Sequence, residues 1–324
     1  MAKYLDPKAD LTFKKVFGEH PNLVASLLNS LLPLPEGEEI ADIEYMSPER
    51  VPRTSIGKNS IVDVFCRTKD GRQFIVEMQM CWTADFKDRA LFNSAKVYVD
   101  QLEHAEDFSM LRPVYSLNLV DDVFEADVSE FIHHYKVVHE KYTDKLIEGF
   151  HIVFVELPKF KPQSIAERKM AVLWLKFLTE VGNKDNDYPP ELLENEDTRQ
   201  AMEIVEVAGY NRAQLMGYDL FWDRVRVERS IHGEAERVRK AAQEQLAAIA
   251  AERDAATAER DAATAERDAA TAERDAATAE RDAAMEKLRQ DKLQAARNLK
   301  AMKLTNEQIA AAIGLPAAEI EKLQ

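Results

Sequence analysis

The sequence is short of cysteine, of long apolar runs and of positive charge, and each shortage excludes a class of protein. Only two of the 324 residues are cysteines, Cys66 and Cys81; two cannot build a disulfide framework, and their spacing matches no zinc site. No stretch of about 18 apolar residues is present, so we expect no contact with a membrane. The first residues contain no apolar segment typical of a secretory signal. We therefore expect a soluble, cytoplasmic protein.

Acidic residues outnumber basic ones, 58 against 43, which gives a net charge of −15. A protein that wraps duplex DNA by charge alone would be basic, so that class is excluded. An enzyme that meets nucleic acid in one local groove remains compatible with this balance. Residues 251–285 contribute −5, because each of five repeated units carries Glu, Arg and Asp, and the other residues therefore carry −10.

That repeat is Ala-Glu-Arg-Asp-Ala-Ala-Thr, beginning at Ala251 and ending with Met285 in place of the last threonine. It is rich in alanine and free of glycine and proline, which predicts a continuous helix about 52 Å long. A coiled coil would have only alanines along its seam, flanked by Glu252 and Asp254, which would repel in a parallel homodimer. Two interpretations remain open, a solvated spacer helix and a weak or heterotypic coiled coil.

The pattern of the chain predicts three domains: a mixed α/β domain at 1–230, a helical spacer at 231–298 and a helix-turn-helix-like hairpin at 299–324. A terminal helical cap or self-association element is the alternative for the last of these. A basic stretch at 287–303 overlaps the start of this region, and Thr305 to Gln308 form a capping box. In the first domain we expect helices at 11–32, 85–104 and 165–181, a hairpin of strands at 61–67 and 73–80, strands at 114–120 and 151–157, and a loop at 183–190.

Two acidic residues interrupt the apolar runs of the predicted hairpin, Asp63 in the first strand and Glu77 in the second. A charge in a buried strand is costly unless it is paired or binds a metal. A three-residue loop at 69–71, with Gly71 in the left-handed conformation, would place Asp63 opposite Glu77, whereas a two-residue turn would put them on opposite faces. Opposed carboxylates repel unless a cation lies between them, and with a backbone carbonyl they suit Mg²⁺. The alternative is that both acids face solvent.

The helix predicted at 85–104 would lie beside this hairpin. At about 100° per residue, its apolar face carries Gln101, while Arg89 and Asn93 fall on the opposite stripe. A glutamine on a core-facing side needs a hydrogen-bond partner. The carboxylate site could provide that partner.

These residues belong to a longer ordered set. Its members are Asp10-Leu-Thr-Phe13-Lys14 with Phe17, then Asp63, Glu77-Met78-Gln79, Arg89, Tyr98-Val-Asp-Gln101, Glu156-Leu-Pro-Lys159-Phe160 and Trp174-Leu-Lys-Phe-Leu178. The set resembles the recombination-promoting nuclease/transposase family of the PD-(D/E)XK nuclease superfamily. The resemblance covers roughly residues 1–230 and leaves out the alanine repeat.

The resemblance implies an α/β fold with a central mixed sheet flanked by helices, here followed by the long alanine-rich helix and the C-terminal hairpin. It also implies cleavage of DNA phosphodiester bonds with Mg²⁺, or alternatively Mn²⁺. Asp63 matches the family's metal-binding aspartate and Glu77 its second acid, and the backbone carbonyl of Met78 is a further expected ligand. Asp10 matches the acidic residue of the first helix, which would complete the metal shell or orient water.

Gln79 stands where most of the superfamily has a lysine. Glutamine carries no positive charge and does not titrate near neutral pH, so it can orient water or a ligand but cannot replace lysine electrostatically. Lys14, one helical turn beyond Asp10, is one candidate for the missing charge, and a larger share of the work by the metal is the other. We expect Gln79 and Gln101 to position the nucleophile or the scissile phosphate, and Lys14, Lys87 and Arg89 to contact phosphates.

The resulting hypothesis is a metal-dependent DNA endonuclease that promotes recombination or acts on mobile or foreign DNA. Its expected partner is DNA, and a homodimer or higher oligomer is left open. The first alternative is a scaffold or DNA-interaction protein whose nuclease fold has lost activity, which the Gln79 substitution favours. The second is a nuclease that acts on RNA or on invading DNA.

Overall fold

The computed structural model describes residues 4–50, 60–103, 105–161, 169–182 and 188–323. They fall into two units, Met1–Glu234 and Ala235–Gln324. Most of the predicted loop at 183–190 and the start of the predicted helix at 165–181 lie outside the described residues. Within the described residues, no helix is long and apolar enough to cross a membrane.

A six-stranded sheet forms the centre of the first unit, with the order β1-β4-β5-β6-β8-β7. The strands are β1 (Ile43–Tyr45), β4 (Val64–Thr68), β5 (Gln73–Gln79), β6 (Val114–Val120), β7 (Ile132–Val138) and β8 (Leu146–Glu156). Strands β5, β6 and β8 are parallel, and the other pairs are antiparallel. Two short strands, β2 (Glu49–Arg50) and β3 (Ser60–Ile61), pair separately. The sheet is therefore mixed, as predicted.

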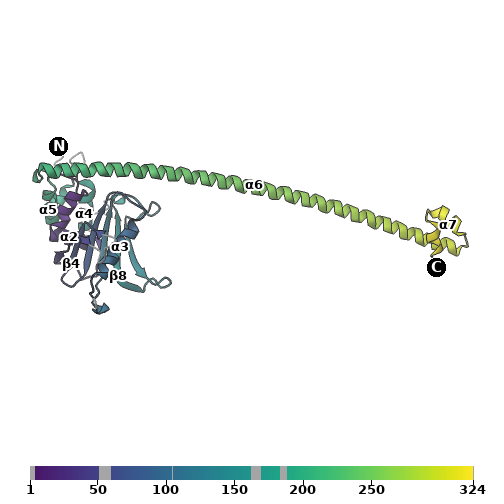
Figure 1. The fold of residues 1–324 in the computed structure, drawn as a ribbon, viewed down its shortest axis with the longest axis horizontal. Coiled ribbons are helices and arrows are strands. Elements are labelled where there is room, and N and C mark those ends of the chain that lie inside the picture. The colour runs from purple at the N-terminus through teal and green to yellow at the C-terminus, as the bar shows by residue number, and fades with distance from the viewer. Residues whose placement is uncertain (1–3, 51–59, 104, 162–168, 183–187, 324) are drawn as a thin grey trace. The chain divides into compact units, whose positions relative to one another are not determined.

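Helices cover both faces of this sheet, with α2 and α4 side by side on one face and α3 on the other (Figure 1). The helices of the unit are α1 (Asp10–Phe13), α2 (Pro21–Leu31), α3 (Phe86–Val99), α4 (Lys169–Glu180), α5 (Glu196–Ile204) and the beginning of α6 (Arg212–Ala301). Short helical turns complete it: a π-helical turn η1 (Lys14–Gly18) and the 3-10 turns η2 (Phe108–Met110), η3 (Leu157–Lys159), η4 (Pro190–Leu193) and η5 (Val207–Gly209).

The single helix predicted at 11–32 is wrong, because the chain forms α1, the π-helical turn η1 and α2 instead. Proline has no N–H to donate and favours the first position of a helix, so Pro21 begins a new helix rather than continuing the previous one. The break matters for the site, since it leaves Asp10 and Lys14 on a short helical segment of their own.

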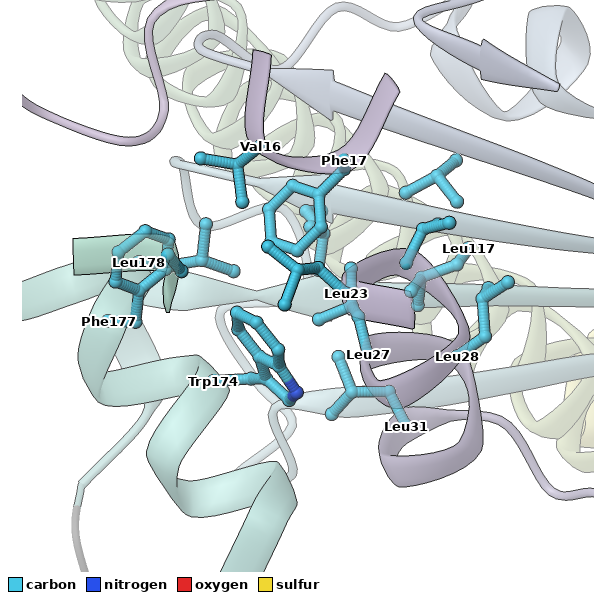
Figure 2. Close-up of a cluster of buried hydrophobic side chains, with 14 of the residues drawn as sticks. Val16, Phe17, Leu23, Leu27, Leu28, Leu31, Leu117, Trp174, Phe177 and Leu178 are labelled. Carbon is cyan, nitrogen blue, oxygen red and sulfur yellow. The ribbon is translucent and has the colours of Figure 1, made fainter. Parts of the chain in front are cut away.

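The larger core lies between the sheet and the α2/α4 layer. Figure 2 shows Trp174 and Phe177 of α4 against Phe17 of η1 and the leucines of α2, and all of these side chains are buried. The Phe17 and Trp174 rings meet edge to face at 5.3 Å between centroids. Strand β6 is buried along its whole length, as its continuous apolar run predicts for a parallel strand covered on both faces.

Side chains of β5 alternate between the two layers. Phe74 and Val76 belong to the core under α2 and α4, whereas Ile75 packs under α3 with Phe65 of β4 and Val97. Glu77 and Gln79 follow Ile75 at intervals of two and therefore face the α3 side. The α3 layer is thus the one that carries the candidate chemistry.

The second unit contains the rest of α6 followed by α7 (Asn306–Ile313) and α8 (Ala317–Glu321). The repeat side chains are exposed along the helix. The capping box at Thr305 is present as predicted, and Gly314 ends α7 with a φ of +67°. A small core of Ala296, Ile309 and Ile320 joins the three helices. The predicted architecture of sheet, long helix and short C-terminal helices is therefore confirmed.

Candidate active site

The turn between β4 and β5 sets the position of the two predicted carboxylates. Gly71 has a φ of +91°, and the Thr68 backbone N–H donates to the Arg72 carbonyl at 3.0 Å, which closes a three-residue loop. The register then pairs Val64 with Val76. One position further along, the same register brings Asp63 opposite Glu77, as the three-residue loop predicts.

Asp63 lies where the β4 ladder ends. The Val62 N–H donates to the Pro48 carbonyl at 3.2 Å rather than across to β5, and the Met78 N–H donates instead to Asp63 Oδ2 at 2.8 Å. The carboxylate thus replaces a backbone acceptor on the edge of β5. Burial raises the pKa of Asp63, although the hydrogen bond from Met78 and the charge of Lys14 oppose this rise.

Glu77 faces α3 beside Asp63. Its Oε1 accepts a hydrogen bond from Asn93 Nδ2 at 3.3 Å. Burial, followed by the negative charge of Asp63, raises the pKa of Glu77 to about 8. The positive charge around Asp63 and Glu77 is therefore too small to keep both carboxylates ionised at neutral pH. An additional cation between them would do so.

Asn93 was predicted on the stripe of α3 that faces away from the site, and that prediction is wrong. The buried side of α3 consists of Phe86, Ala90, Asn93, Ser94 and Val97. Leu91, an apolar residue of the same helix, is 49% exposed. The buried side of the helix therefore differs from its apparent apolar face, and the asparagine on that buried side meets Glu77.

Gln79 is held on both sides of its amide. Its Nε2 donates to the Cys81 carbonyl at 2.7 Å, and its Oε1 accepts from Arg89 Nη2 at 2.6 Å. The Arg89 guanidinium also lies 4.7 Å from the centre of the Phe86 ring. Gln79 therefore orients an arginine next to the carboxylates. Burial raises the pKa of both Asp63 and Glu77, and the positive charge of Arg89 opposes part of this rise.

Asp10 and Lys14 reach the site from the N-terminal helical segment. Lys14 Nζ lies 2.6 Å from Asp10 Oδ1 and 3.8 Å from Asp63 Oδ1. Burial works to lower the pKa of Lys14, but the hydrogen bond and charge of Asp10, with Asp63 and Glu77 beyond it, raise it overall. Asp10 is thus linked to Asp63 through a lysine rather than placed beside it.

The donors that could hold a divalent cation are the Asp63 and Glu77 carboxylates and the Met78 carbonyl. The N–H and C=O of one strand residue point to the same edge, so the Met78 carbonyl lies on the Asp63 side, whereas the Gln79 carbonyl accepts from the Asp121 N–H at 2.8 Å on the opposite edge. Among the described residues no three acidic, histidine or cysteine side chains converge. Two carboxylates short of positive charge and a backbone oxygen are hard ligands and fit Mg²⁺ or Mn²⁺.

A family model of PD-(D/E)XK nuclease family transposases matches residues 7–221. The chain belongs to this family. No curated protein and no solved structure matches it. The matched region contains every site residue described above and ends before the alanine repeat, so the resemblance inferred from the sequence is confirmed. Membership in a PD-(D/E)XK nuclease family supports a nuclease-type hydrolase, and nucleases of this kind generally use divalent metals.

Gln101, which was predicted for this PD-(D/E)XK site, lies elsewhere. Gln101 exchanges two hydrogen bonds with the backbone of Arg112, at 2.9 and 2.8 Å. Arg112 precedes β6, whose first residue pairs with Gln73 at the start of β5, whereas Glu77 and Gln79 lie toward the end of β5. Gln101 therefore fixes a loop at the other end of the sheet. It was expected at the site because the assumed face of the helix was wrong.

Lys87 also has partners of its own. It forms an ion pair with Glu125 and lies 5.1 Å from the Phe124 ring and 5.3 Å from the Tyr135 ring. It belongs to the flank of α3 that faces β7 and β8, not to the flank that carries Arg89 and Asn93.

The later family signature at 156–160 serves the fold. Glu156 is fully buried and accepts hydrogen bonds from His133 Nε2 at 2.8 Å and from the Phe124 N–H at 2.6 Å. Lys159 Nζ lies 2.5 Å from its Oε2. Burial would raise the pKa of Glu156, but the hydrogen bonds from Lys159 and His133 outweigh it and lower that pKa. This hydrogen-bonded cluster ties the loop after β6 to the end of β8.

Proposed function

We propose that this PD-(D/E)XK family member is a metal-dependent endonuclease that hydrolyses phosphodiester bonds in DNA. The transposase description of the family fits a role in recombination or in cleavage of mobile or foreign DNA. Asp63 and Glu77 would hold the cation, with the Met78 carbonyl as a third ligand. A divalent ion bound there supplies a water of lowered pKa and neutralises charge on the phosphate.

The observation that carries this proposal is the position of Asp63, directly before β4, opposite Glu77 of the neighbouring strand β5. The first accepts a hydrogen bond from the backbone of β5, and the second accepts one from Asn93. Each carboxylate is therefore fixed before any ligand arrives, which limits the reorganisation needed during reaction. Burying two acidic groups side by side lowers the stability of the protein, so stability alone does not explain why both are present.

The charge that lysine supplies in related nucleases would come from two other residues here. Lys14 Nζ lies 3.8 Å from Asp63 Oδ1. Arg89 is held by its hydrogen bond to Gln79, and its charge acts on both carboxylates. We assign Lys14 and Arg89 to the phosphate and Gln79 to holding Arg89. Asp10 keeps Lys14 in place through the 2.6 Å ion pair. This division explains how a neutral glutamine can occupy the lysine position.

The test is nicking of a supercoiled plasmid with titrated Mg²⁺ or Mn²⁺. We expect cleavage by the wild-type chain and a loss of at least about a hundredfold in Asp63→Ala and Glu77→Ala, since each removes a metal ligand. Asp42→Ala is the matched control, because Asp42 is an exposed acid paired with Lys69. Circular dichroism and the melting temperature verify that every variant is folded.

Unchanged products in Glu77→Ala would refute the assignment of the site. A folded wild-type chain that cleaves nothing with either metal, yet binds DNA, would favour the scaffold function instead. A parallel assay on single-stranded RNA of the same sequence decides between the two polymers. We expect DNA to be the preferred substrate.

A further inference from the structure

The first turns of α6 lie against the segment that follows Gln79. Val225 of α6 is buried with Met80 and Cys81, and Phe221 and Trp222 pack against the same cluster. All of these contacts lie within the first unit. The end of the candidate catalytic strand is therefore covered by residues that come almost 150 positions later in the sequence.

Arg229 is the polar centre of this contact. Its Nη2 donates to Asp121 Oδ2 at 2.7 Å and to the Met80 carbonyl at 3.3 Å. The same Nη2 also lies 3.5 Å from the Asp121 carbonyl, to which it donates. Asp121 follows the last residue of β6, and Met80 follows the last residue of β5. One guanidinium thus joins the ends of two neighbouring parallel strands.

Gln79 forms hydrogen bonds with residues at the ends of both strands. Its backbone carbonyl accepts from the Asp121 N–H at 2.8 Å, and its side-chain Nε2 donates to the Cys81 carbonyl at 2.7 Å. The direction of the Gln79 amide therefore depends on where the turn at 80–82 lies. Since Gln79 Oε1 accepts from Arg89, the position of that arginine depends on it too.

We infer that Arg229 is a positioning residue, which sets the direction of Gln79 and Arg89 by clamping the turn at 80–82 to Asp121. This inference rests on the proposed nuclease function. It assigns to the start of α6 a direct part in shaping the site, although Arg229 lies outside the region matched by the family model. Arg229 itself contacts neither Asp63 nor Glu77, and in this proposal it does not contact the substrate.

The first experiment compares Arg229→Ala with Arg226→Ala in the full chain. Arg226 lies on the same helix and pairs with Asp223 at an exposed position, so its loss is a matched control. We expect Arg229→Ala to lower kcat about ten- to hundredfold with little change in KM, because misplacement of a positioned group slows chemistry more than binding. Arg226→Ala should cleave like the wild type.

Two further variants separate positioning from general stability. Asp121→Asn removes the ion pair but keeps the backbone N–H that holds Gln79, and should lower kcat in the same direction. Arg229→Lys keeps one charged contact and should restore part of the rate. Melting temperatures of all variants are measured alongside, so that a rate lost through unfolding is recognised.

The second experiment does not depend on cleavage. Cys81 is 2% exposed beneath α6, and Cys66, the other thiol, lies in the central core with no exposed surface. We expect a maleimide, followed by mass spectrometry, to label Cys81 severalfold faster in Arg229→Ala than in Arg226→Ala. Cys66 labelling, which reports unfolding, should remain slow in both.

The outcomes distinguish this inference from the proposed function. Wild-type cleavage that Arg229→Ala leaves unchanged overturns the positioning role alone, as does equal labelling of Cys81 in the two arginine variants. A rate loss accompanied by equally fast labelling of both cysteines would show that the variant merely unfolds, and also overturns it. No cleavage by the wild type overturns the proposed function and the positioning role together.

Discussion

Glu77 combines burial with a like-charged neighbour, so its proton is tied to the stability of the metal-free protein. Its pKa rises from 4.5 to about 8 on folding. Between these values the folded chain holds a proton that the unfolded chain has released. The free energy of unfolding therefore falls as the pH rises through this window.

We predict that, with divalent ions chelated, the Glu77→Gln variant no longer loses unfolding free energy as the pH rises from about 5 to about 8. The variant should melt several degrees above the wild type at about pH 8 and close to it at about pH 5, because glutamine is neutral at both. Melting temperatures measured in EDTA across this range provide the check. Glu44→Gln, at an exposed ion pair with Arg67, is the control, and parallel profiles for all three proteins would contradict the prediction.

At the scale of elements, the end of α4 passes very close to the N-terminal segment. Gly182 has a φ of +83°, and a Cβ added there would lie 2.4 Å from Asp6 Cα. Gly37 has nearly the same φ, +82°, but nothing lies within 4 Å of its Cβ position. The two glycines therefore separate backbone strain from steric overlap.

Gly37→Ala should cost about 1 kcal/mol of unfolding free energy, the usual penalty for a left-handed alanine. Gly182→Ala should cost about 3 kcal/mol or more, because the N-terminal segment must also move away. Urea unfolding of both variants measures the difference. If both variants lost the same unfolding free energy, the segment around Asp6 would be able to move away without destabilising the fold.

The sequence predicts those elements whose pattern of apolar residues matches the burial that they have in the fold. The bounds of β6 were predicted correctly from a continuous apolar run. For Asp63 and Glu77, the sequence leaves a three-residue loop and a two-residue turn open, and the observed loop at 69–71 is the one that places them opposite each other. Both features depend on nearby residues, but the sequence alone decides only the bounds of β6.

What the sequence does not predict depends on distant contacts. Asn93 is buried because Glu77 lies beneath it, and no periodic pattern of α3 reveals that. Strand β7 is largely exposed at the edge of the sheet, so it lacks the apolar run that identifies β6. Arg229 acts on residues that are remote in sequence, and no motif around it gives a signal.

On the scale of the whole chain, the repeat adds length without adding core. Its side chains are exposed, and each threonine donates only to the carbonyl four residues earlier, as Thr257 does to Arg253 at 2.9 Å. The arginine and aspartate side chains that pair are adjacent in sequence. Helix propensity alone therefore maintains this segment.

We predict that deletion of residues 258–271, two complete units, leaves the cleavage rate within about a factor of two of the wild type, since the helix rejoins in the same sequence and shortens by about 21 Å. Plasmid nicking and the melting temperature provide the measurements. A large loss of activity would contradict the spacer interpretation. A weak coiled coil would instead make the melting of the helix depend on protein concentration.

The C-terminal helices α7 and α8 pack against the end of α6, because Ala296 of α6 forms one core with Ile309 and Ile320. Lys300 of the same helix donates to the Ile320 carbonyl at 3.4 Å, and Arg289 lies 3.5 Å from Glu319. A peptide cut after α6 would expose this core on one side. A fusion of the C-terminal helices to another protein must therefore include about the last four turns of α6.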